Sequence, residues 1–551
     1  MAKEIETLHG KKTSFQGICQ KMLAEITSAY MFLMMAVYPL YYQNKYYNIG
    51  TAKWRFFTFC TSGAGVLLGA VLILYFLSLI PRRRPKNAAG KIPFSATDWF
   101  ALLYGASALL STLLSPYKEQ VVWGREGWYM GLVSQLSFVW IYFLVSRCWR
   151  WSGWEILCWL GTAFLVFFLG VLMRFRVDPL GMYQGLEERY ILDFLTTIGQ
   201  ATWYSSYLVL LLPLGVFAFW FYHHRLLRLF GGIFSWIGFM SLATQNSDSA
   251  LAALCILLFA LFWFSMENAE AFGRFLEVVL LCLASMRLAG LCQRLFPERA
   301  VPLGRLFLFC SQDASGWVLL AVALGGLLFF RRQEGRKPMD FTRYKKVPLG
   351  ALFLLLWAVF CVVAYICLNT MGYLPDHLKS TNNYLLFDEY WGNNRGSTWA
   401  IGVKSYGKGS LLRKFFGCGP DGFSAYVGSF FKEELDRKWG RGTMLTCAHN
   451  EWLNTLVNLG ITGAVTYMGI FLSAICRFFK KRKECPELIA VGISVMCYMG
   501  HNFFCYQQIV CTPTVFLLMG AGEALIRQGR SPCPGDPPLC QTGSSQLPPG
   551  L

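Results

Sequence analysis

The sequence predicts an all-α fold, a polytopic bundle of transmembrane helices with one large loop outside the membrane. The chain of 551 residues is 55% hydrophobic and only 15% charged, with a mean hydropathy of +0.42, so it is far more apolar than a soluble domain. Apolar runs long enough to cross a bilayer recur from one end of the chain to the other. Basic residues crowd the polar segments between alternate runs, as the positive-inside rule describes.

We expect about fourteen spans of about 17–24 residues, because helices of this length cross the hydrocarbon core. The predicted spans are residues 25–43, 56–80, 97–114, 129–146, 154–173, 201–222, 230–245, 249–265, 274–291, 314–330, 347–368, 453–475, 487–505 and 510–526. The first span follows a lysine-bearing start and has no small-residue cleavage site behind it, which indicates a retained helix. Only "TQNSDS" separates the seventh span from the eighth, so a single re-entrant hairpin is an alternative for this pair.

These spans divide the chain into five regions. Residues 1–24 form a cytoplasmic N-terminal segment, and residues 25–368 hold spans one to eleven. Residues 369–452 form the large extracytoplasmic loop, whose mixed charge, glycines and aromatic residues predict short helices packed on the bundle. Spans twelve to fourteen occupy 453–526, and the Pro/Gly/Ser-rich tail at 527–551 is predicted to be disordered. The basic segments place both termini in the cytoplasm.

The net charge of +19 would suggest nucleic acid as a partner if the chain were soluble. Here the basic residues gather in short cytoplasmic segments such as "PRRRPKNAAGK" and "RFFKKRK", so we expect membrane lipids and no nucleic acid as partners. Most of the 19 cysteines lie inside apolar runs, where thiols behave as small hydrophobic groups. Cys418 and Cys447 share the large loop, and spacing alone does not decide whether they pair.

Arg395 lies at the start of a predicted helix in the large loop, in "NNRGSTWAIGVKSYGKG". Ser397 or Asn394 could cap this helix, and Trp399 shares a face with Arg395. A guanidinium at a helix start can bind a phosphate through two parallel hydrogen bonds, which makes Arg395 a candidate phosphate ligand. An interfacial arginine beside a structural turn is the alternative interpretation.

"CAHNEWLNTLVNLG" places His449, Asn450 and Glu451 at the predicted start of span twelve. Imidazole is the side chain best suited to accept a proton near neutral pH, so His449 is a candidate general base. Asn450 could cap the helix, and Glu451 could orient the imidazole or simply favour the helix dipole. A structural interfacial histidine is the alternative. His501 repeats the His-Asn pair in "GHNFF", among apolar residues that predict packing.

Arg125 and Arg189 lie on predicted outward loops, against the charge rule. Phosphate binding explains such arginines, and so does snorkelling of the side chain to lipid headgroups. Aromatic residues of the large loop could stack on sugars or belong to the interfacial belt. His, Cys and Asp residues show no metal-ligand spacing in the sequence, and no P-loop, G-x-S-x-G or Rossmann pattern occurs. We therefore expect no metal and no cofactor.

Together these segments resemble the O-antigen ligase and O-antigen polymerase family of integral-membrane glycosyltransferases. "AHNEWLNTLVNLGITGAVTYMGIFLSAI" is similar to the family signature "HN-x-x-L…E/N-x-G-x-x-G", and it follows the largest external loop. "NRGSTWAIGVKSYGKGSLLRKFFGCGPDGF" resembles the family's "R-x-x-x-W…P-x-x-G-x-G-x-x-x-F" stretch. "RYILDFLTTIGQATWYSSYLVLLLPL" and "STLLSPYKEQVVWGREGWYMGL" resemble two further motifs. The resemblance covers about residues 95–525.

The resemblance implies a GT-C-like membrane enzyme of a bacterial cytoplasmic membrane that acts in cell-surface polysaccharide biosynthesis. It implies a metal-independent transfer on the extracytoplasmic side, from a glycan on undecaprenyl diphosphate to a hydroxyl of a glycan or lipid-linked glycan. His449 would be the catalytic base, and Arg395 would bind the diphosphate. Further substrate-binding candidates are Arg189, Arg125, Trp399, Asn450 and Glu451.

The chain departs from the family pattern at two positions. Asp248 stands in "TQNSDSA" where the family has an arginine, and Gln200 replaces an asparagine in "IGQATW". The role of the missing arginine would pass to Arg125, Arg189 or Arg395, or the substrate differs.

Two other functions stay open, a polysaccharide or lipid transporter (flippase) and a non-enzymatic assembly partner of a polysaccharide export system. Transporters usually carry charged residues along a central path through the membrane. The predicted spans carry few such residues, with Asp248 and Arg287 near span ends, and the polar residues gather on one side. This distribution favours chemistry on one face of the membrane.

Overall fold

Helices dominate the computed structural model of the chain, which describes residues 15–77 and 94–529. In these residues, strands occur only in one short antiparallel pair, β1 (Phe194–Leu195) and β2 (Gly199–Gln200). The all-α class expected from the sequence is therefore confirmed. The first 14 residues, the basic segment "PRRRPKNAAGK" and the tail from residue 530 lie outside the described residues.

The described residues include nine helices that are long and apolar enough to cross a membrane. They are α3 (Ile49–Leu77), α4 (Ala96–Leu114), α7 (Gly153–Met173), α9 (Ala201–Phe221), α10 (Arg225–Thr244), α12 (Ala269–Leu295), α14 (Ser315–Arg336), α15 (Val347–Thr370) with the preceding η2 (Phe341–Tyr344), and α19 (Glu451–Lys481). Shorter apolar helices are α6 (Leu132–Cys148), α11 (Ser249–Ser265) and α20 (Glu487–His501). The first and last predicted spans hold α2 (Phe15–Phe32) with η1 (Leu33–Val37), and α21 (Thr512–Gln528). A multi-pass membrane protein agrees with this set, while the count of fourteen spans stays a prediction.

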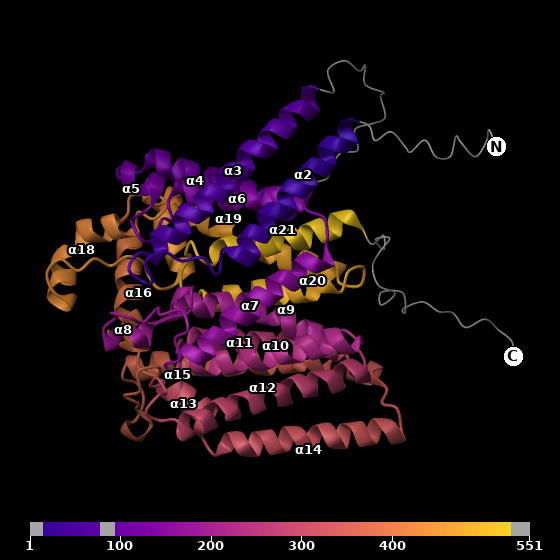
Figure 1. Cartoon of the computed structure of the whole chain (residues 1–551). Helices are drawn as coiled ribbons and strands as arrows, with labels where there is room; N and C mark the ends of the chain where they lie inside the picture. Colours follow the sequence, from indigo (N-terminus) through magenta and orange to yellow (C-terminus); the bar gives the residue numbers. More distant parts are fainter. Residues whose placement is uncertain (1–14, 78–93, 530–551) are drawn as a thin grey trace, which may run out of the picture.

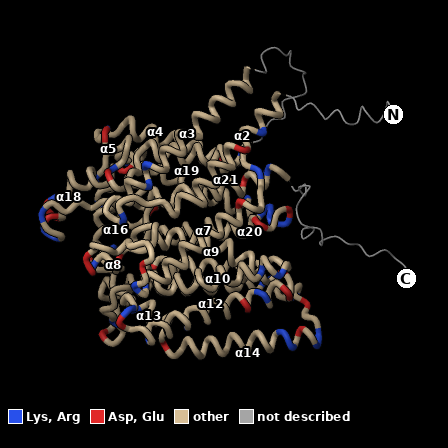
Figure 2. Tube along the Cα trace, in the orientation of Figure 1, with Lys and Arg blue, Asp and Glu red and all other residues tan. Residues whose placement is uncertain are grey.

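These helices lie side by side in one bundle (Figure 1). The short helices α5 (Lys118–Trp123), α8 (Glu188–Asp193), α16 (Trp391–Lys408) and α18 (Phe423–Trp439) gather at one end, whereas α2 begins and α21 ends at the other. Charged residues also gather at the two ends and leave the middle of the bundle almost free of charge (Figure 2). This separation is what a bilayer around the middle of the bundle requires.

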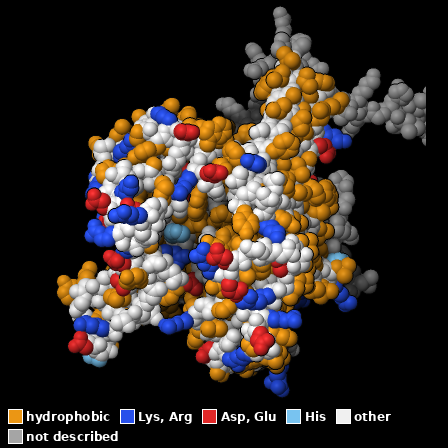
Figure 3. Space-filling view, turned by 60° about the vertical axis from the view of Figure 1, so that its left-hand side comes forward, with side chains coloured by type: hydrophobic (Ala, Val, Ile, Leu, Met, Phe, Trp, Pro, Cys, Tyr) orange, Lys and Arg blue, Asp and Glu red, His pale blue; other side chains and the backbone are white. Residues whose placement is uncertain are grey.

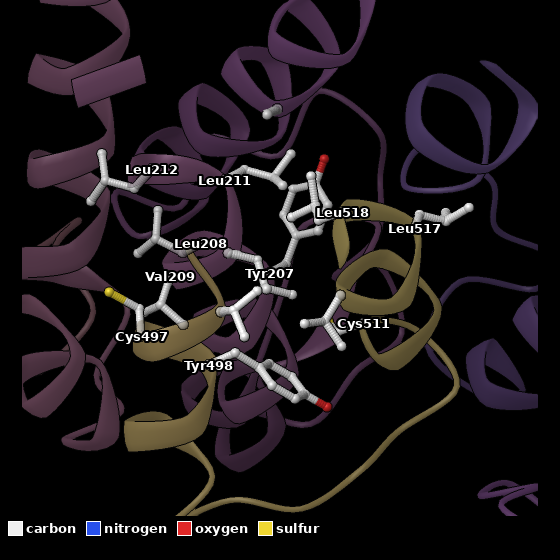
Figure 4. Packing of buried hydrophobic residues seen from close by; sticks show 14 of the residues in the cluster. Tyr207, Leu208, Val209, Leu211, Leu212, Cys497, Tyr498, Cys511, Leu517 and Leu518 are labelled. Atoms are coloured by element: carbon white, nitrogen blue, oxygen red, sulfur yellow. The ribbon is translucent and has the colours of Figure 1, made fainter. Parts of the chain in front are cut away.

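The centre of the bundle is α9, which packs against α10 and α20. Buried side chains of α9, including Tyr207 and Leu208, share one apolar cluster with Cys497 and Tyr498 of α20 and with Leu518 of α21 (Figure 4). In its most apolar window, 83% of α9 is buried, whereas the window of Phe341–Thr370 is 0% buried. The outer helix is the more hydrophobic of the two, with a hydropathy of 2.8 against 1.7.

The end of the bundle opposite α16 and α18 holds a network of buried charges. Asp98 of α4 forms an ion pair with Arg147 of α6 at 3.1 Å and accepts a hydrogen bond from Arg527 of α21 at 2.7 Å. Arg527 also pairs with Glu523 at 2.9 Å, and Glu523 pairs with Arg477 of α19 at 2.7 Å. Asp98 and Glu523 lie inside the predicted spans 97–114 and 510–526, so these spans carry more charge near their ends than expected. Because each carboxylate has basic partners, the network ties four helices together without leaving a buried charge unpaired.

The large loop folds into short helices, η3 (Asp376–Leu378), α16, α17 (Leu411–Phe416) and α18. A small apolar core of its own includes Ile401 of α16 and Phe423 and Val427 of α18, packed with Val457 of α19. Cys418 joins this core as a free thiol, and Cys447 is also unpaired. The loop is thus fastened to the start of α19 by packing rather than by a disulfide.

Candidate functional site

The start of α19 fixes the position of His449. The Asn450 side chain accepts a hydrogen bond from the Leu453 N–H at 3.0 Å and so caps the helix. This cap leaves Asn450 buried, at 7% exposed, and outside the pocket described below. His449 precedes the cap in the left-handed backbone region, with φ of +51°, a conformation that non-glycine residues adopt rarely. The cap and the turn together direct the His449 side chain away from the axis of α19.

Arg395 lies inside α16, directly after a turn that interrupts this helix. Three residues with positive φ, from Gly392 to Asn394, form a turn directly before it. The Arg395 guanidinium donates to the Gly392 carbonyl at 2.9 Å and lies over the Phe504 ring at 5.9 Å. In the described part of the loop, the ion pairs join other residues and leave Arg395 without a carboxylate partner. The guanidinium is therefore available to an anionic ligand.

His449 and Arg395 line the same pocket, which has a volume of about 290 Å³. The other lining residues are mostly polar: Gln200, Thr202, Asn393, Asn394, Thr398, Trp439, Thr443, Met444 and Leu445. Seen from this end, the molecular surface is hollowed between basic side chains, and histidine atoms are visible in the hollow (Figure 3). The sequence hypothesis that these two residues share a cavity thus agrees with the geometry.

Burial and the positive charge of Arg395 together lower the pKa of His449 to about 4. Both causes disfavour the imidazolium form. The imidazole is therefore neutral at pH 7 and can accept a proton from a hydroxyl placed in the pocket. Its described ring contact is with Tyr506, edge-to-face at 5.1 Å between ring centroids.

Arg189 and Arg125 do not line this pocket. Arg189 is 68% exposed, pairs with Glu187 at 2.9 Å and lies over its neighbour Tyr190. Arg125 borders a separate open hollow beside α5, where its backbone N–H donates to Asp421 at 2.7 Å. Arg189 thus has a local partner at the surface, whereas one guanidinium nitrogen of Arg125 is buried without a hydrogen-bond partner among the described residues. Neither side chain lines the pocket of His449 and Arg395, and phosphate binding by either arginine stays a prediction.

Trp399 and Glu451 also lie outside the pocket. Trp399 packs against Trp391 at 5.0 Å and stacks on Phe504 at 6.2 Å, behind Arg395. The Glu451 carboxylate accepts hydrogen bonds from the Thr455 hydroxyl and from the Gln507 backbone N–H, each at 2.6 Å. It borders a separate cavity of about 30 Å³. Neither side chain lines the pocket, and ligand binding by Trp399 or Glu451 stays a prediction.

Several pocket residues were not identified from the sequence as ligands. Gln200 and Thr202 stand in the segment "IGQATW", which belongs to one of the four motifs but offered no ligand, and Gln200 was noted only as a departure from the family pattern. Asn393 was not singled out, and Asn394 was considered only as a helix cap. Two side-chain amides directly before Arg395 are a sequence signal for a polar ligand site. Nothing in the apolar segment around Tyr506 marks that residue as a neighbour of His449.

Asp248 contacts the large loop near the same end of the bundle. The Tyr384 hydroxyl donates to its carboxylate, and burial together with this bond raises the pKa of Tyr384. His501 is fully buried, at 0% exposed, and lies 2.7 Å from the Ser205 hydroxyl. The packed environment expected for His501 is thus present, and a carboxylate stands where the family has an arginine.

Comparison of the sequence with known protein families and with curated proteins finds no match. Within the described ranges, no group of three or more His, Cys, Asp and Glu side chains is arranged to hold a metal ion. The family resemblance therefore depends on the four sequence motifs, and the independence from metal stays a prediction.

Proposed function

We propose that the chain is a membrane glycosyltransferase of the O-antigen ligase or polymerase type. It moves a glycan from undecaprenyl diphosphate to a hydroxyl of a glycan or lipid-linked glycan on the outer side of the membrane. The observation that supports this proposal is that His449 and Arg395, which belong to different motifs of the sequence, line one pocket. A neutral imidazole beside an arginine without a carboxylate partner suits an acceptor hydroxyl next to a phosphate.

The proposed reaction is a single displacement at the anomeric carbon of the donor. His449 accepts the proton of the acceptor hydroxyl as its oxygen forms the new glycosidic bond. The bond between the anomeric carbon and the diphosphate oxygen breaks, and the electron pair leaves with the diphosphate. Arg395 stabilises the negative charge that develops there, in a pocket whose walls hold the donor and acceptor close together.

Transfer by the purified protein, from a lipid-diphosphate glycan to an acceptor glycan, tests the proposal. We expect His449→Ala to lower the rate by about 10²–10⁴-fold, the usual contribution of a general base. Arg395→Ala should lower it by about 10²–10³-fold through loss of charge stabilisation. A chelator should leave the rate unchanged.

The chain offers matched controls for both substitutions. His377→Ala removes an exposed histidine of the same loop, and Arg189→Ala removes an exposed arginine outside the pocket. Both controls should retain transfer. A folded His449→Ala variant with the wild-type rate would contradict the catalytic role. Movement of the lipid across vesicle membranes without transfer would indicate a transporter, and neither activity would indicate an assembly partner.

A further inference from the structure

Tyr506 stands between two cavities of opposite electrostatic character. On one side its ring meets the His449 imidazole edge-to-face, at 5.1 Å and an interplanar angle of 79°. On the other side Tyr506 borders the cavity of about 30 Å³ whose walls include Asp421 and Glu451. His449 faces the larger pocket with Arg395. The Tyr506 ring is thus a wall between the imidazole and these carboxylates.

The Tyr506 ring is held from several directions, and the residue is only 2% exposed. Its hydroxyl donates to the Gln200 side chain at 3.1 Å and accepts from the Trp203 indole N–H at 3.2 Å. Trp128 packs on the ring at 4.8 Å. The Gln507 backbone N–H donates to the Glu451 carboxylate at 2.6 Å, which fixes the chain directly after Tyr506. A ring with this many partners has little freedom to turn away from His449.

The titratable groups around His449 show why the separation by the Tyr506 ring affects the protonation of the imidazole. Arg395 of α16 faces the imidazole from the pocket and disfavours its charged form. Asp421, in the turn before α18, and Glu451, at the start of α19, lie beyond the ring as buried carboxyl groups, and burial raises the pKa of Asp421 to about 7. The remaining titratable neighbours, the thiols of Cys447 and Cys505, lie in apolar packing. A carboxylate or water reaching the imidazole would favour imidazolium, because opposite charge and hydration both stabilise that form.

We propose that Tyr506 is a positioning residue that fixes the orientation of the His449 imidazole and separates it from the carboxylates of Asp421 and Glu451. The proposal deepens the proposed function, because a general base must be neutral and aimed at its proton donor. The protonation and orientation of the His449 imidazole can be tested whichever reaction the pocket supports.

The protonation of His449 can be measured without any substrate. Diethyl pyrocarbonate acylates neutral imidazoles, and mass spectrometry of the His449 peptide at a series of pH values gives the pKa of this residue alone. In the full-length protein we expect a value near 4. Tyr506→Ala should raise it by about 1 unit or more, because water then reaches the imidazole and stabilises its charged form. Tyr506→Phe keeps the ring and should leave the value close to that of wild type.

A further variant makes the test specific. Phe239→Ala truncates a fully buried ring of α10 and controls for general loosening of the core; it should not shift the pKa of His449. An unshifted value in a folded Tyr506→Ala variant, or an equal shift in Phe239→Ala, would overturn the proposal, and so would a Tyr506→Phe value that follows Tyr506→Ala.

Glycan transfer measured on the same variants separates this inference from the proposed function. If both proposals hold, the acid limb of the rate profile moves with the pKa of His449 in each variant. The Tyr506→Phe profile then matches that of the wild-type protein. A shifted imidazole in a protein that transfers no glycan would refute the reaction and leave the role of Tyr506 intact. Glycan transfer by the wild-type protein together with an unchanged His449 pKa in Tyr506→Ala would support the reaction and refute the role of Tyr506.

Discussion

At the scale of residues, the two charges of the pocket depend on each other. Arg395 disfavours the imidazolium form of His449, which contributes to the lowered pKa of about 4. A phosphate bound to Arg395 would compensate the guanidinium charge and so raise the basicity of the imidazole. Anion binding and proton acceptance would then be coupled. His449 would be the strongest base when the diphosphate of the glycan donor is bound to Arg395.

Arg395→Gln tests this coupling, because it removes the charge and keeps hydrogen-bond donors. Without the positive neighbour the imidazolium form is less disfavoured, so the pKa of His449 should rise above about 4 and the acid limb of the rate profile should move to higher pH. The rate at neutral pH should fall about 10²-fold or more with the lost charge stabilisation. Profiles of kcat/KM against pH measure both effects. Arg189→Gln is the control, and an acid limb that stays in place in Arg395→Gln would contradict the coupling.

His449 and Arg395 could be found from the sequence because each stands at a helix start that local residues define. The "HN" cap pattern and the turn before Arg395 are short-range signals. The sequence does not show the partners of Arg189 and Arg125 in the same way. Glu187 pairs with the Arg189 side chain, and Asp421 accepts from the Arg125 backbone N–H, only in the folded chain.

At the scale of elements, two glycines fasten the large loop to α19. α17 ends at Gly417 with φ of +71°, and α19 bends at Gly460 with φ of +67°. The N–H groups of Cys418 and Gly419 donate to the carbonyls of Val457 and Asn458 at 3.1 and 2.8 Å. A Cβ atom on Gly460 would lie 2.3 Å from the Phe415 backbone. The close approach of the two backbones therefore requires glycine at this point.

Gly460→Ala should loosen this junction. With φ of +67° and ψ of −171°, Gly460 has a backbone conformation that is almost limited to glycine and costs about 1–3 kcal/mol for a residue with a Cβ, and the backbone contact adds to that cost. We expect a lower thermal midpoint in detergent and faster hydrogen exchange at residues 411–419. Gly407→Ala is the control, since a Cβ there meets no atom within 4 Å in α16 and alanine favours a helix. Equal stability of the two variants would show that the glycine contact is dispensable.

The bend at Gly460 also marks a limit of the sequence analysis at this scale. The predicted span 453–475 was a continuous helix, and the apolar pattern continues through the bend without interruption. A glycine inside a helical pattern is compatible with an ordinary turn of helix. Only the backbone of α17, packed against the same position, makes a left-handed residue necessary.

At the scale of the whole molecule, hydropathy identifies helices but not their places in the bundle. The segment Phe341–Thr370 has the highest hydropathy of the nine long apolar helices in the described ranges, yet no residue of its most apolar window is buried. α9 is less hydrophobic and forms the centre, with Ser205, Ser206 and Tyr207 buried. Lipid is as apolar as a leucine side chain, so the most hydrophobic helix gains nothing from a central position. Helix order therefore needed the structure, whereas the separation of charge to the two ends was visible in the sequence (Figure 2).

The orientation of this bundle in the membrane is a prediction that follows from that separation. The positive-inside rule places the ends of α2 and α21 in the cytoplasm and the pocket outside. A green fluorescent protein fused after the C-terminus should therefore fluoresce in bacterial cells. A protease site inserted at the exposed turn Gly440–Gly442 should be cut by protease added to intact spheroplasts. The same site placed after Lys483, in the predicted cytoplasmic segment "RFFKKRK", should be cut only after the cells are lysed. Cleavage in the opposite pattern would put His449 and Arg395 on the cytoplasmic side, where an outward-facing lipid diphosphate could not reach them.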